Sequence, residues 1–591
     1  MLDEEIQHIF TTKTNSWVPM RAPLHLVFDE HEREMLVAAR NKFDTTKRKV
    51  IFLSFENKYA ACGGLAAVAR YLPEQLALKG EQLCIVSPFY PNQKAVKEAL
   101  DRGQIIPEFH NLSVNIGETE YNVYLYKDNS PSVVTFFIGV EGFFQAQNDP
   151  YDYADNQQLL IDALVYAAVL PSVLQKIGMT DNLILHANDW ETALVAISSK
   201  KALFSGMFKH ANTVLTLHNS FDSHLPEQLA EHFLGIKPLG QTVLQSSLPF
   251  LDSPLTTVST AFACELRNDP IQCQLFTPHL QNGFGQNPPI GIENGLFGKT
   301  MRLRTSKTTN SAEHEMAAIL KDKKQKRRKL EKYLLSPPGN PVYGSITFRR
   351  GRGQVPVFFM SGRLDLAQKG FDVIFRAFRR LSPGSAKLVF TPSNPRNGNE
   401  HQLSFFKNMC VECSGDITIW PYRVDEKIYH ECLSGASFLI MPSFYEPFGA
   451  ATEGFLHGTP VIARATGGLI SQVNSVIKIQ LPAFYGHFAS REATDAKPNG
   501  ILYREETFDE NASEQWRTIL SLSVERRDEV PIYNRMVDAA SQALETALSV
   551  YHDQVRYATI IRNGMDSLHR FSWESSVNRY RTIYDLTASG R

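Results

Sequence analysis

Long apolar runs and Asp-x-Asp pairs are missing from this 591-residue chain, and its first residues do not have the pattern of a secretory signal. No stretch of about eighteen residues is uniformly apolar, so we expect no membrane span. The chain holds no Asp-x-Asp pair, so neither a bound metal nor another cofactor is indicated. The first residues, MLDEEIQHIF, are acidic and lack the basic start and apolar core of a secretory signal. These absences favour a cytoplasmic protein.

Cysteine is scarce, and neither sign of charge dominates. The seven cysteines are scattered, and an odd number without a signal sequence favours reduced thiols. Cys410 and Cys413 form a C-x-x-C pair, but no second pair follows at zinc-finger spacing, so packing on one helix face is favoured over a metal or redox role. The 61 basic and 62 acidic residues give a net charge of −1, which argues against a dedicated nucleic-acid binder.

The most informative stretch is residues 435–468, which read GASFLIMPSFYEPFGAATEGFLHGTPVIARATGG. The pattern predicts a buried parallel strand over 436–441, a loop over 444–448, a helix from Gly449 and a second strand over 460–463. Such loops lie at the carboxyl edge of an open α/β sheet, where ligands bind. The stretch therefore predicts a binding site.

The residue types in this stretch indicate which groups the site would bind. Helix N-termini near Phe448-Gly449 and at Thr466-Gly467-Gly468 offer N–H groups that suit phosphate. Glu446 suits sugar hydroxyls, since each hydroxyl can donate to a carboxylate. Glu453 lies two helical turns further on and suits a second diol. Phe448 and Tyr422 are candidates for packing on a nucleobase, although aromatic residues near strand ends are more often core.

Two cations follow another buried strand, expected over 355–361. Arg363 and Lys369 occupy the loop between that strand and an amphipathic helix. Each can make charge-assisted hydrogen bonds to phosphate oxygens, so together they suit a diphosphate.

The first half of the chain repeats the same order of elements. A strand over 50–55 precedes Gly63-Gly64, a helix ending near residue 80 and a strand over 83–87, which together form a βαβ unit. Glycines at that turn let backbone N–H groups approach a phosphate. Short strands are expected over 121–126 and 133–138, and Asp155 has the position of a helix N-cap.

Polar residues follow the next strands of this half. His186 and Asn188 follow a strand expected over 182–185, and His218-Asn219 follows one over 213–217. A histidine such as His186 is equally consistent with a hydrogen-bonded core residue. Further along, residues 315–335 are strongly basic and helical in pattern, for which a solvated helix face is favoured over binding to nucleic acid or an acidic partner.

The segments EPFGAATEG, GTPVIA and ATGGL together resemble the donor site of retaining glycosyltransferases with two Rossmann-like domains, above all glycogen and starch synthases. HANDW, IGIENGLF, KPNGILY and the last helix, 571–586, resemble further segments of these enzymes, and the resemblance spans residues 49–586. It implies an α/β fold of GT-B type, in which two doubly wound parallel-sheet domains face a central cleft.

The resemblance also implies a domain plan. Residues 1–48 would be an N-terminal extension, and 49–340 an acceptor domain that includes the basic helical segment near 315–335. Residues 341–560 would form the nucleotide-sugar donor domain, and 561–591 a C-terminal helix that crosses back to the first domain.

The family's functional residues can be placed on this sequence. Those implied in catalysis are Arg363, Lys369 and Glu446. Those implied in binding the donor and its phosphates are Gly63, Gly64, Phe448, Gly449, Glu453, Thr466, Gly467 and Gly468. Those implied to line the sugar and acceptor cleft are Asp155, His186, Asn188, His218 and Asn219.

Three positions depart from the family pattern. Ala61 stands where the family has a lysine, and Asn188 where it has a histidine. Asparagine can hydrogen-bond a hydroxyl but cannot carry a proton. Six residues separate Glu446 from Glu453, where the family usually has seven.

The implied reaction is transfer of glucose from ADP-glucose or UDP-glucose to an α-1,4-glucan, with retention and without a metal. A phosphate oxygen of the leaving diphosphate would take the acceptor's proton. Two alternatives stay open at this point. One is a divergent transferase that uses another sugar, or a protein or small-molecule acceptor, and the other is a non-catalytic glycan-binding scaffold.

Overall fold

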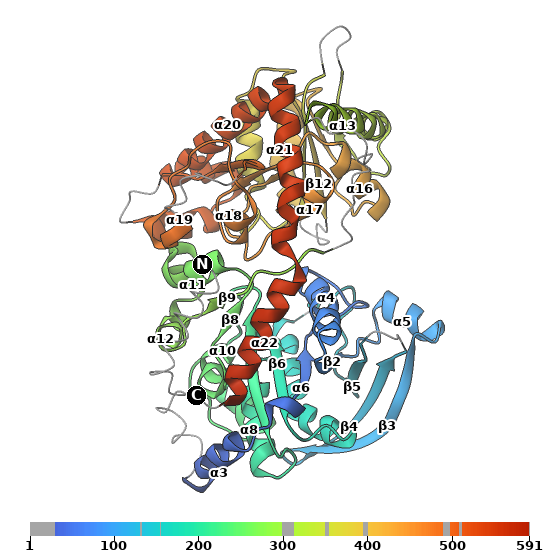
Figure 1. Ribbon diagram of the computed structural model, residues 1–591, viewed down its shortest axis with the longest axis vertical. Coiled ribbons are helices and arrows are strands. Elements are labelled where there is room, and N and C mark those ends of the chain that lie inside the picture. Colours follow the sequence, from blue (N-terminus) through green and yellow to red (C-terminus); the bar gives the residue numbers. More distant parts are fainter. Residues whose placement is uncertain are drawn as a thin grey trace. The chain divides into compact units, whose positions relative to one another are not determined.

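The computed structural model describes residues 30–129, 133–153, 155–297, 312–348, 354–393, 400–488, 497–506 and 511–589. Their contacts divide the chain into two units (Figure 1). Unit 1 comprises Met1–Val258, Phe276–Gly295 and Trp573–Arg591, and unit 2 comprises Ser259–Leu275 and Leu296–Ser572. Each unit is built on one largely parallel sheet.

The sheet of unit 1 has nine described strands in the order β3-β4-β5-β2-β1-β6-β7-β8-β9. All neighbours pair in parallel except β3 with β4 and β4 with β5. The central strands β1, β6 and β7 are almost wholly buried, as continuous apolar runs in parallel sheets are. The strands are β1 (Lys49–Leu53), β2 (Gln82–Pro88), β3 (Ile105–Ile116), β4 (Thr119–Asp128), β5 (Thr135–Val140), β6 (Leu183–Asn188), β7 (Ala211–Leu217), β8 (Thr256–Thr257) and β9 (Ile290–Gly291).

The helices of unit 1 include one that is long and apolar enough to cross a membrane, α6. Two thirds of its apolar window is buried, and it contacts α7, α8 and α9, as the core helix of a globular unit does. The helices are α3 (Glu30–Asn41), α4 (Gly64–Leu78), α5 (Lys94–Asp101), α6 (Asn156–Lys176), α7 (Trp190–Ala193), α8 (Val195–Phe204), α9 (Glu227–Leu234), α10 (Val243–Ser247), α12 (Gln281–Gln286) and α22 (Trp573–Ser589).

The sheet of unit 2 has seven described strands in the order β10-β13-β12-β11-β14-β15-β16. Only β10 is antiparallel to its neighbour, β13. The strands are β10 (Tyr343–Gly344), β11 (Val357–Arg363), β12 (Lys387–Ser393), β13 (Ile417–Ile419), β14 (Phe438–Met441), β15 (Val461–Arg464) and β16 (Gly500–Tyr503).

Two groups of helices pack on this second sheet. One group links α13, α16, α17 and α21 by mutual contacts, and the other links α14, α15, α19 and α20. The helices are α11 (Thr260–Asn268), α13 (Ala312–Leu335), α14 (Phe371–Arg379), α15 (Ser404–Glu412), α16 (Glu426–Gly435), α17 (Ala451–Leu456), α18 (Gly468–Gln472), α19 (Ala512–Ser521), α20 (Pro531–His552) and α21 (Gln554–Ser567).

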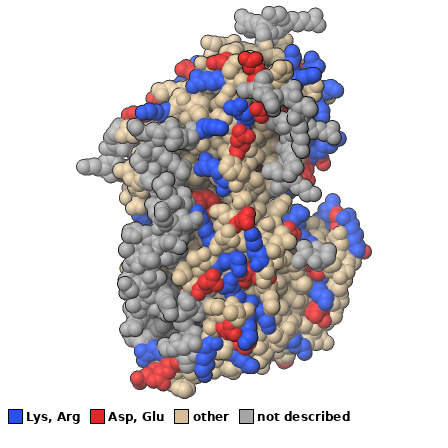
Figure 2. Space-filling view, viewed as in Figure 1, with Lys and Arg blue, Asp and Glu red and all other residues tan. Residues whose placement is uncertain are grey.

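The strands expected near 50–55, 83–87, 213–217, 387–391 and 436–441 are present as β1, β2, β7, β12 and β14. The predicted pair of doubly wound sheets is therefore confirmed. Cys410 is buried in α15, and burial raises the pKa of its thiol to about 12, which agrees with a packing role. On the face shown in Figure 2, cationic and anionic side chains of the described residues are interspersed, in line with the balanced net charge.

Two segments that the sequence assigned to the first domain belong to the second unit instead. Residues 259–275, which carry α11, and the basic helix α13 both belong to unit 2. Helix α13 belongs to unit 2 because its buried face packs against α16 and α21. Lys323 on that face donates to the carbonyls of Ser434 and Gly458 and to the hydroxyl of Thr459, at 2.6–2.9 Å. The C-terminal helix predicted over 561–591 is in fact two helices, of which α21 lies in unit 2 and α22 in unit 1.

Candidate functional site

Among the parallel strands of each sheet the strand order reverses at one point, and several of the sequence-predicted residues lie there. The reversal falls between β11 and β14 in unit 2 and between β1 and β6 in unit 1. Arg363 ends β11 and Glu446 follows β14, while Gly63 follows β1 and Asn188 ends β6. Open α/β sheets bind ligands at the carboxyl ends of strands where the order reverses. Topology and sequence thus point to the same loops.

Lys369 and Glu446 form an ion pair in unit 2. The Nζ atom of Lys369 lies 2.7 Å from Oε2 of Glu446, and the two side chains are 19% and 13% exposed. The hydroxyl of Ser443 donates to the same carboxylate oxygen at 2.7 Å. The cation expected to bind a diphosphate and the carboxylate expected to bind a sugar therefore neutralise each other in this structure.

Arg363 is exposed beside this pair, and Gln368 joins the two loops. A guanidinium nitrogen of Arg363 lies 3.4 Å from Oε1 of Gln368. The backbone carbonyl of Gln368 accepts the N–H of Phe444 at 2.7 Å, and its side-chain amide donates to the carbonyl of Tyr445 at 3.4 Å. Gln368 thus ties the loop with both cations to the loop with Glu446, and sequence reasoning missed it.

The turn formed by residues 466–468 packs directly on the Glu446 loop. A Cβ atom on Gly467 would lie 1.8 Å from the carbonyl oxygen of Glu446, and one on Gly468 would lie 1.9 Å from that of Phe448. Gly467 also has a φ of +47°, which other residues rarely adopt. Both positions therefore require glycine for close backbone packing.

A buried carboxylate from α11 caps the same turn. Oε1 of Glu265 accepts the N–H of Gly467 at 2.6 Å and the hydroxyl of Thr466 at 2.8 Å, and the phenol of Tyr485 donates to it as well. Glu265 is 1% exposed, and burial, reinforced by the charge of Asp269, raises its pKa to about 7.

This arrangement corrects one expectation about phosphate. The N–H of Gly467 is taken by Glu265, and that of Gly468 donates to the carbonyl of Glu446 at 3.1 Å. Neither N–H is free for a phosphate, and the hydroxyl of Thr466 is also used. The turn instead supports the backbone that carries Glu446.

Phe448 and Gly449 complete the loop after β14. The ring of Phe448 is 7% exposed and meets Phe297 edge-on, with 6.2 Å between ring centroids. Its carbonyl accepts the side-chain amide of Gln472 at 2.8 Å. The expected helix begins at Ala451 rather than at Gly449, which has a φ of +81°. A nucleobase contact by Phe448 stays a prediction.

Glu453 points toward α16. Its carboxylate accepts a hydrogen bond from the phenol of Tyr429 at 3.4 Å. Burial raises the pKa of Glu453, and the neighbouring His430 opposes that shift. In the described part of the chain, the hydrogen bonding of Glu453 thus involves α16 and not the Glu446 loop, and a diol contact stays a prediction.

In unit 1, a second buried glutamate caps the other glycine turn. Oε2 of Glu56 accepts the N–H groups of Cys62, Gly63 and Ala66 at 2.8–3.3 Å, and Tyr151 donates to Oε1 at 3.2 Å. The N–H of Gly63 is therefore not free for a phosphate, contrary to expectation. Gly64 is exposed, and a Cβ atom there would meet nothing within 4 Å, so a ligand has room to approach it.

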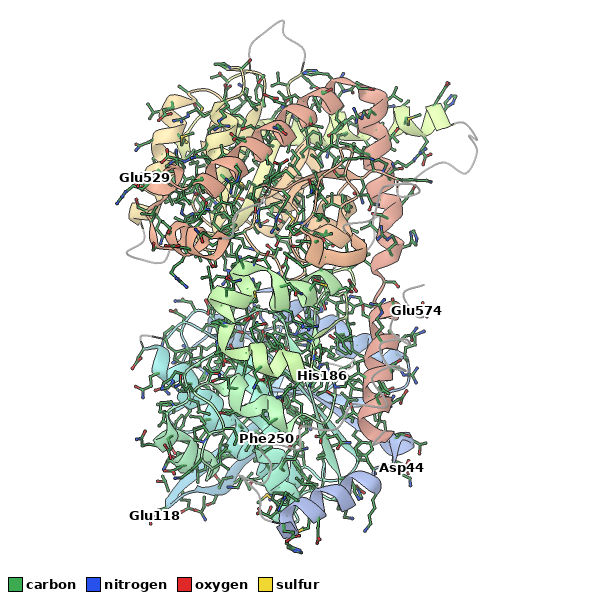
Figure 3. The ribbon with its side chains drawn as sticks, turned by 90° about the vertical axis from the view of Figure 1, so that its left-hand side faces the viewer. Asp44, Glu118, His186, Phe250, Glu529 and Glu574 are labelled. Atoms are coloured by element: carbon green, nitrogen blue, oxygen red, sulfur yellow. The ribbon has the colours of Figure 1, made fainter. Side chains whose placement is uncertain are left out.

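His186 lies in the interior of unit 1 (Figure 3). Its ring nitrogens contact the hydroxyls of Tyr584 and Thr216, each at 2.8 Å. Burial lowers its pKa to about 3, so it is neutral at pH 7. Its expected place in the sugar cleft is wrong, and the core alternative holds, because both nitrogens are engaged inside the unit.

Asn188 fixes the tautomer of His218. The amide nitrogen of Asn188 donates to the carbonyls of Leu53 and His186, which leaves Oδ1 as an acceptor. That oxygen lies 2.8 Å from Nε2 of His218, so Nε2 carries the proton and donates. Burial lowers the pKa of His218 to about 3. Nδ1 of His218 is therefore an acceptor at neutral pH.

Asn219 and Asp155 are held in different ways. Asp189 accepts the side-chain amide of Asn219 at 3.0 Å and the backbone N–H of His218 at 2.6 Å, which fixes the turn after β7. Burial raises the pKa of Asp189 to about 7. Asp155 is exposed and accepts the N–H of Gln157 at 2.9 Å, so its predicted role as the N-cap of α6 is confirmed.

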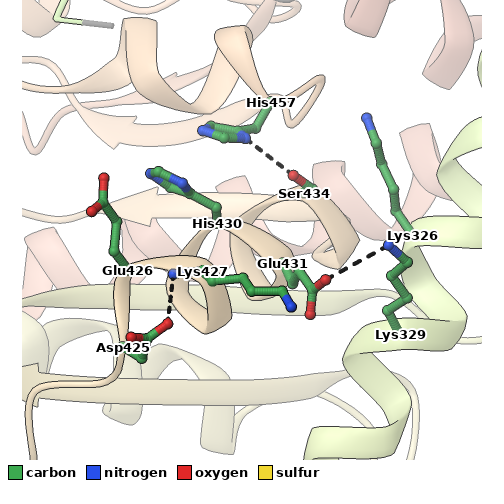
Figure 4. A pocket seen from close by; sticks show the side chains of 9 residues that line it. All are labelled: Lys326, Lys329, Asp425, Glu426, Lys427, His430, Glu431, Ser434 and His457. Carbon is green, nitrogen blue, oxygen red and sulfur yellow. Dashed lines mark hydrogen bonds and ion pairs between the residues drawn. The ribbon is translucent and has the colours of Figure 1, made fainter.

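A pocket of about 550 Å³, lined by charged and polar residues, lies between α13, α16 and the end of α17 (Figure 4). Lys329 pairs with Glu431 at 3.6 Å, and Lys326 with Asp322 at 2.9 Å, so its cations are largely neutralised. It contains none of the sequence-predicted site residues, and we assign it no ligand. Its lining residues are Lys326, Lys329, Asp425, Glu426, Lys427, His430, Glu431, Ser434 and His457.

The chain is similar in sequence to known glycosyltransferases. Residues 49–277 match a family model described as a starch synthase catalytic domain, and residues 315–579 match one described as a family 4 glycosyltransferase in conflict systems. Glycogen synthase of Aromatoleum aromaticum is 25% identical over 551 residues, which cover 89% of this chain and 94% of the relative. Glycogen synthase 2 of Geobacter sulfurreducens is 25% identical over 565 residues, covering 92% and 99%.

A solved structure shows the same fold. The catalytic domain of starch synthase IV from Arabidopsis thaliana, bound to ADP and acarbose, superposes with a TM-score of 0.66 at 19% identity, covering 92% of this chain and 99% of that one. With two doubly wound sheets and charged loops at their reversal points, the chain is a glycosyltransferase of the GT-B fold. Its first half is similar to the starch synthase catalytic domain, and the whole chain is similar to glycogen synthases at about 25% identity.

The structure adds three residues that sequence reasoning missed, namely Glu56, Glu265 and Gln368. Each lies near a predicted site residue in space. Glu56 also lies seven residues before Gly63, and an acidic residue shortly before a glycine turn is a signal for an internal cap. Glu265 is 201 residues from Thr466, so no local pattern announces it.

The tautomer of His218 is directly testable. We expect its Nε2 to be protonated and Nδ1 unprotonated at pH 7, since Asn188 offers only an acceptor to Nε2. In Asn188→Ala the acceptor is gone, so both tautomers should be populated. Long-range ¹H–¹⁵N NMR correlations on histidine-labelled protein measure this, and a wild-type His218 protonated on Nδ1 would contradict the assignment.

Proposed function

We propose that this chain transfers glucose from ADP-glucose or UDP-glucose to an α-1,4-glucan, with retention of the anomeric configuration. The observation that carries the proposal is that Arg363, Lys369 and Glu446 lie on the two loops of the β11–β14 reversal point, in a chain similar to glycogen and starch synthases. The relatives named glycogen synthase and the relative solved with ADP and acarbose support a nucleotide donor and a carbohydrate acceptor.

The Lys369–Glu446 pair suggests how the donor enters. A diphosphate competes with Glu446 for Lys369, and Arg363 is exposed to bind it as well. Glu446, released from its partner, then accepts hydrogen bonds from the sugar hydroxyls. One exchange of partners thus prepares both halves of the donor site.

In the proposed reaction the bond between the anomeric carbon and the diphosphate oxygen breaks as a bond to the acceptor oxygen forms. Lys369 and Arg363 neutralise the negative charge that grows on the leaving diphosphate. The acceptor attacks from the face that the diphosphate leaves, and a phosphate oxygen takes its proton. These cationic side chains fill the part that a divalent metal has elsewhere, so we expect no metal requirement.

The residues of unit 1 have a narrower proposed part. His218 presents Nδ1 as an acceptor, and the exposed Asp155 adds a carboxylate for sugar hydroxyls. Asn219 contributes by fixing the turn after β7, because both polar atoms of its side chain are hydrogen-bonded there. Asn188 acts through His218, because its own polar atoms are hydrogen-bonded inside the unit. We keep the expectation that the reaction takes place in the cytoplasm, without a membrane or nucleic-acid partner.

A second candidate is a transferase of the same family that moves another sugar or uses another acceptor. Ala61 and Asn188, which replace the family's lysine and histidine, favour it, as does the short spacing between Glu446 and Glu453. A non-catalytic scaffold is set aside, because the similarity to known glycosyltransferases and the three charged residues of the donor loops indicate an enzyme.

The proposal is tested with purified protein, glycogen, and ADP-glucose or UDP-glucose, with and without EDTA. We expect glucose incorporation from one of the two donors, in linkages that an α-1,4-glucosidase removes, at the same rate with chelator. Donor hydrolysis without incorporation would favour the second candidate. An activity lost in EDTA and restored by magnesium or manganese would contradict the proposed cationic mechanism.

Lys369 should act mainly on the chemical step. Lys369→Ala is expected to lower kcat by about 10²–10³, by analogy with removal of one oxyanion-hole donor, while donor KM changes less. Lys326→Ala is a matched control, because Lys326 is similarly buried and also pairs with a carboxylate. Steady-state kinetics measure both variants, and an unchanged kcat in Lys369→Ala would refute the role.

Glu446→Gln should separate sugar binding from diphosphate binding. The variant releases Lys369 from its ion pair, so affinity for ADP or UDP should rise by about fivefold, the equivalent of roughly 1 kcal/mol. Transfer should fall at the same time, because the sugar loses its carboxylate. Glu412→Gln, which breaks the exposed pair with Arg379, is the control. Calorimetry and initial rates decide, and weaker diphosphate binding in Glu446→Gln would argue against this competition.

A further inference from the structure

Glu265 belongs to a buried charge network beneath the donor loops of unit 2. Arg464 and Glu505 form an ion pair in which both side chains are fully buried. Arg504 contacts Glu505 at 3.4 Å and Asp269 at 3.1 Å. Glu265 lies beside these groups on α11, one turn before Asp269.

The network holds the loops by their backbones. Arg464 donates to the carbonyl of Phe444, and Arg504 donates to that of Ala465 at 2.7 Å. Glu265 in turn accepts hydrogen bonds from the N–H of Gly467 and the hydroxyl of Thr466. The chain before Glu446 and the turn behind it are thus both tied to buried charges.

Charge balance sets Glu265 apart from the other carboxyl groups of the network. Two guanidinium groups, Arg464 and Arg504, face three carboxyl groups, Asp269, Glu265 and Glu505. The arginines hold the pKa of Glu505 below its usual range despite burial. Glu265 makes no ion pair in the described residues, and its Oε2 has no hydrogen-bond partner there. It is therefore the member of the network whose charge is least compensated.

We propose that Glu265 is a positioning residue for the transfer reaction, which holds Glu446 in place through the 466–468 turn. This inference rests on the proposed function, since it assigns Glu446 to the sugar. The route is short, because Oε1 of Glu265 fixes Gly467 and the N–H of Gly468 donates to the carbonyl of Glu446. Because Gly467 and Gly468 have no Cβ atoms, the backbone of the turn packs directly against the backbone of the Glu446 loop.

The proposal has a consequence for pH. The groups that face Glu265 are Asp269 on its own helix, Tyr485, Arg504 and the polar atoms of the turn. With a pKa of about 7, Glu265 ionises as the pH rises through neutrality. Ionised Oε1 accepts its hydrogen bonds more strongly, so the turn is held more firmly at higher pH. We expect kcat to rise through this range.

Glu265→Gln and Glu265→Leu test the proposal in the full chain. Glutamine keeps an acceptor at Oε1 but cannot ionise, so kcat should match wild type at pH 6, stay about threefold below it at pH 8, and lose the transition near 7. Leucine removes the acceptor of the Gly467 N–H and the shorter of two hydrogen bonds from the Thr466 hydroxyl, so kcat should fall at least tenfold at both pH values. ADP or UDP affinity should stay within about threefold, because Arg363 and Lys369 are not touched.

Two more variants separate positioning from general stability. Tyr485→Phe removes a donor to Glu265, so the transition in kcat should move to higher pH. Asp416→Asn is the control, since Asp416 is a buried carboxyl of unit 2 that pairs with Lys387 away from these loops. It should leave the transition in place. A wild-type transition that survives in Glu265→Gln would overturn the proposal.

Hydrogen exchange keeps this test independent of the proposed function. In Glu265→Leu, the amides of residues 465–469 should exchange at least tenfold faster than in wild type, whichever substrate the enzyme uses. Unchanged exchange would overturn the positioning role even if the enzyme is active. Faster exchange in a protein that uses neither donor would reject the proposed function while supporting the structural link.

Discussion

The loop that carries Glu446 depends on direct contact between its backbone and the backbone of the 466–468 turn. The carbonyl oxygens of Glu446 and Phe448 occupy the space that side chains at 467 and 468 would need. Such contact fixes the position of one backbone segment relative to the other more closely than a contact through a flexible side chain would. Everything proposed for Glu446, from its pairing with Lys369 to its reach toward a sugar, presupposes this rigid support.

Buried carboxylates serve both glycine turns. Glu56 accepts backbone N–H groups at the start of α4, and Glu265 does so at the start of α18. A helix N-terminus favours negative charge, and here the protein supplies that charge itself. Burial opposes ionisation in both cases and raises both pKa values. Each turn is therefore ordered by a buried carboxyl group of the chain itself, independently of a ligand.

The sequence predicted the two sheets, most strand positions and the loops of the candidate site, because buried parallel strands and glycine turns leave local patterns. It did not show that the N–H groups of Gly63 and Gly467 are already used. Glu265 is 202 residues from Gly467, so no local pattern reveals that contact, whereas the acidic residue seven positions before Gly63 was a local signal that sequence reasoning missed. His186 was misplaced for a related reason. Its partner Tyr584 is 398 residues away, and only tertiary packing brings the two together.

The Lys369–Glu446 pair has a consequence for the end of the catalytic cycle. In the proposed reaction, the carboxylate of Glu446 would be vacant once the glucosyl unit has left, while Lys369 would still hold the spent nucleotide diphosphate. The carboxylate, 2.7 Å from the lysine in this structure, would then compete for that charge from within the protein. Glu446 would thus act as a built-in displacer of product, so that departure of the nucleotide is assisted by the same residue that had received the sugar.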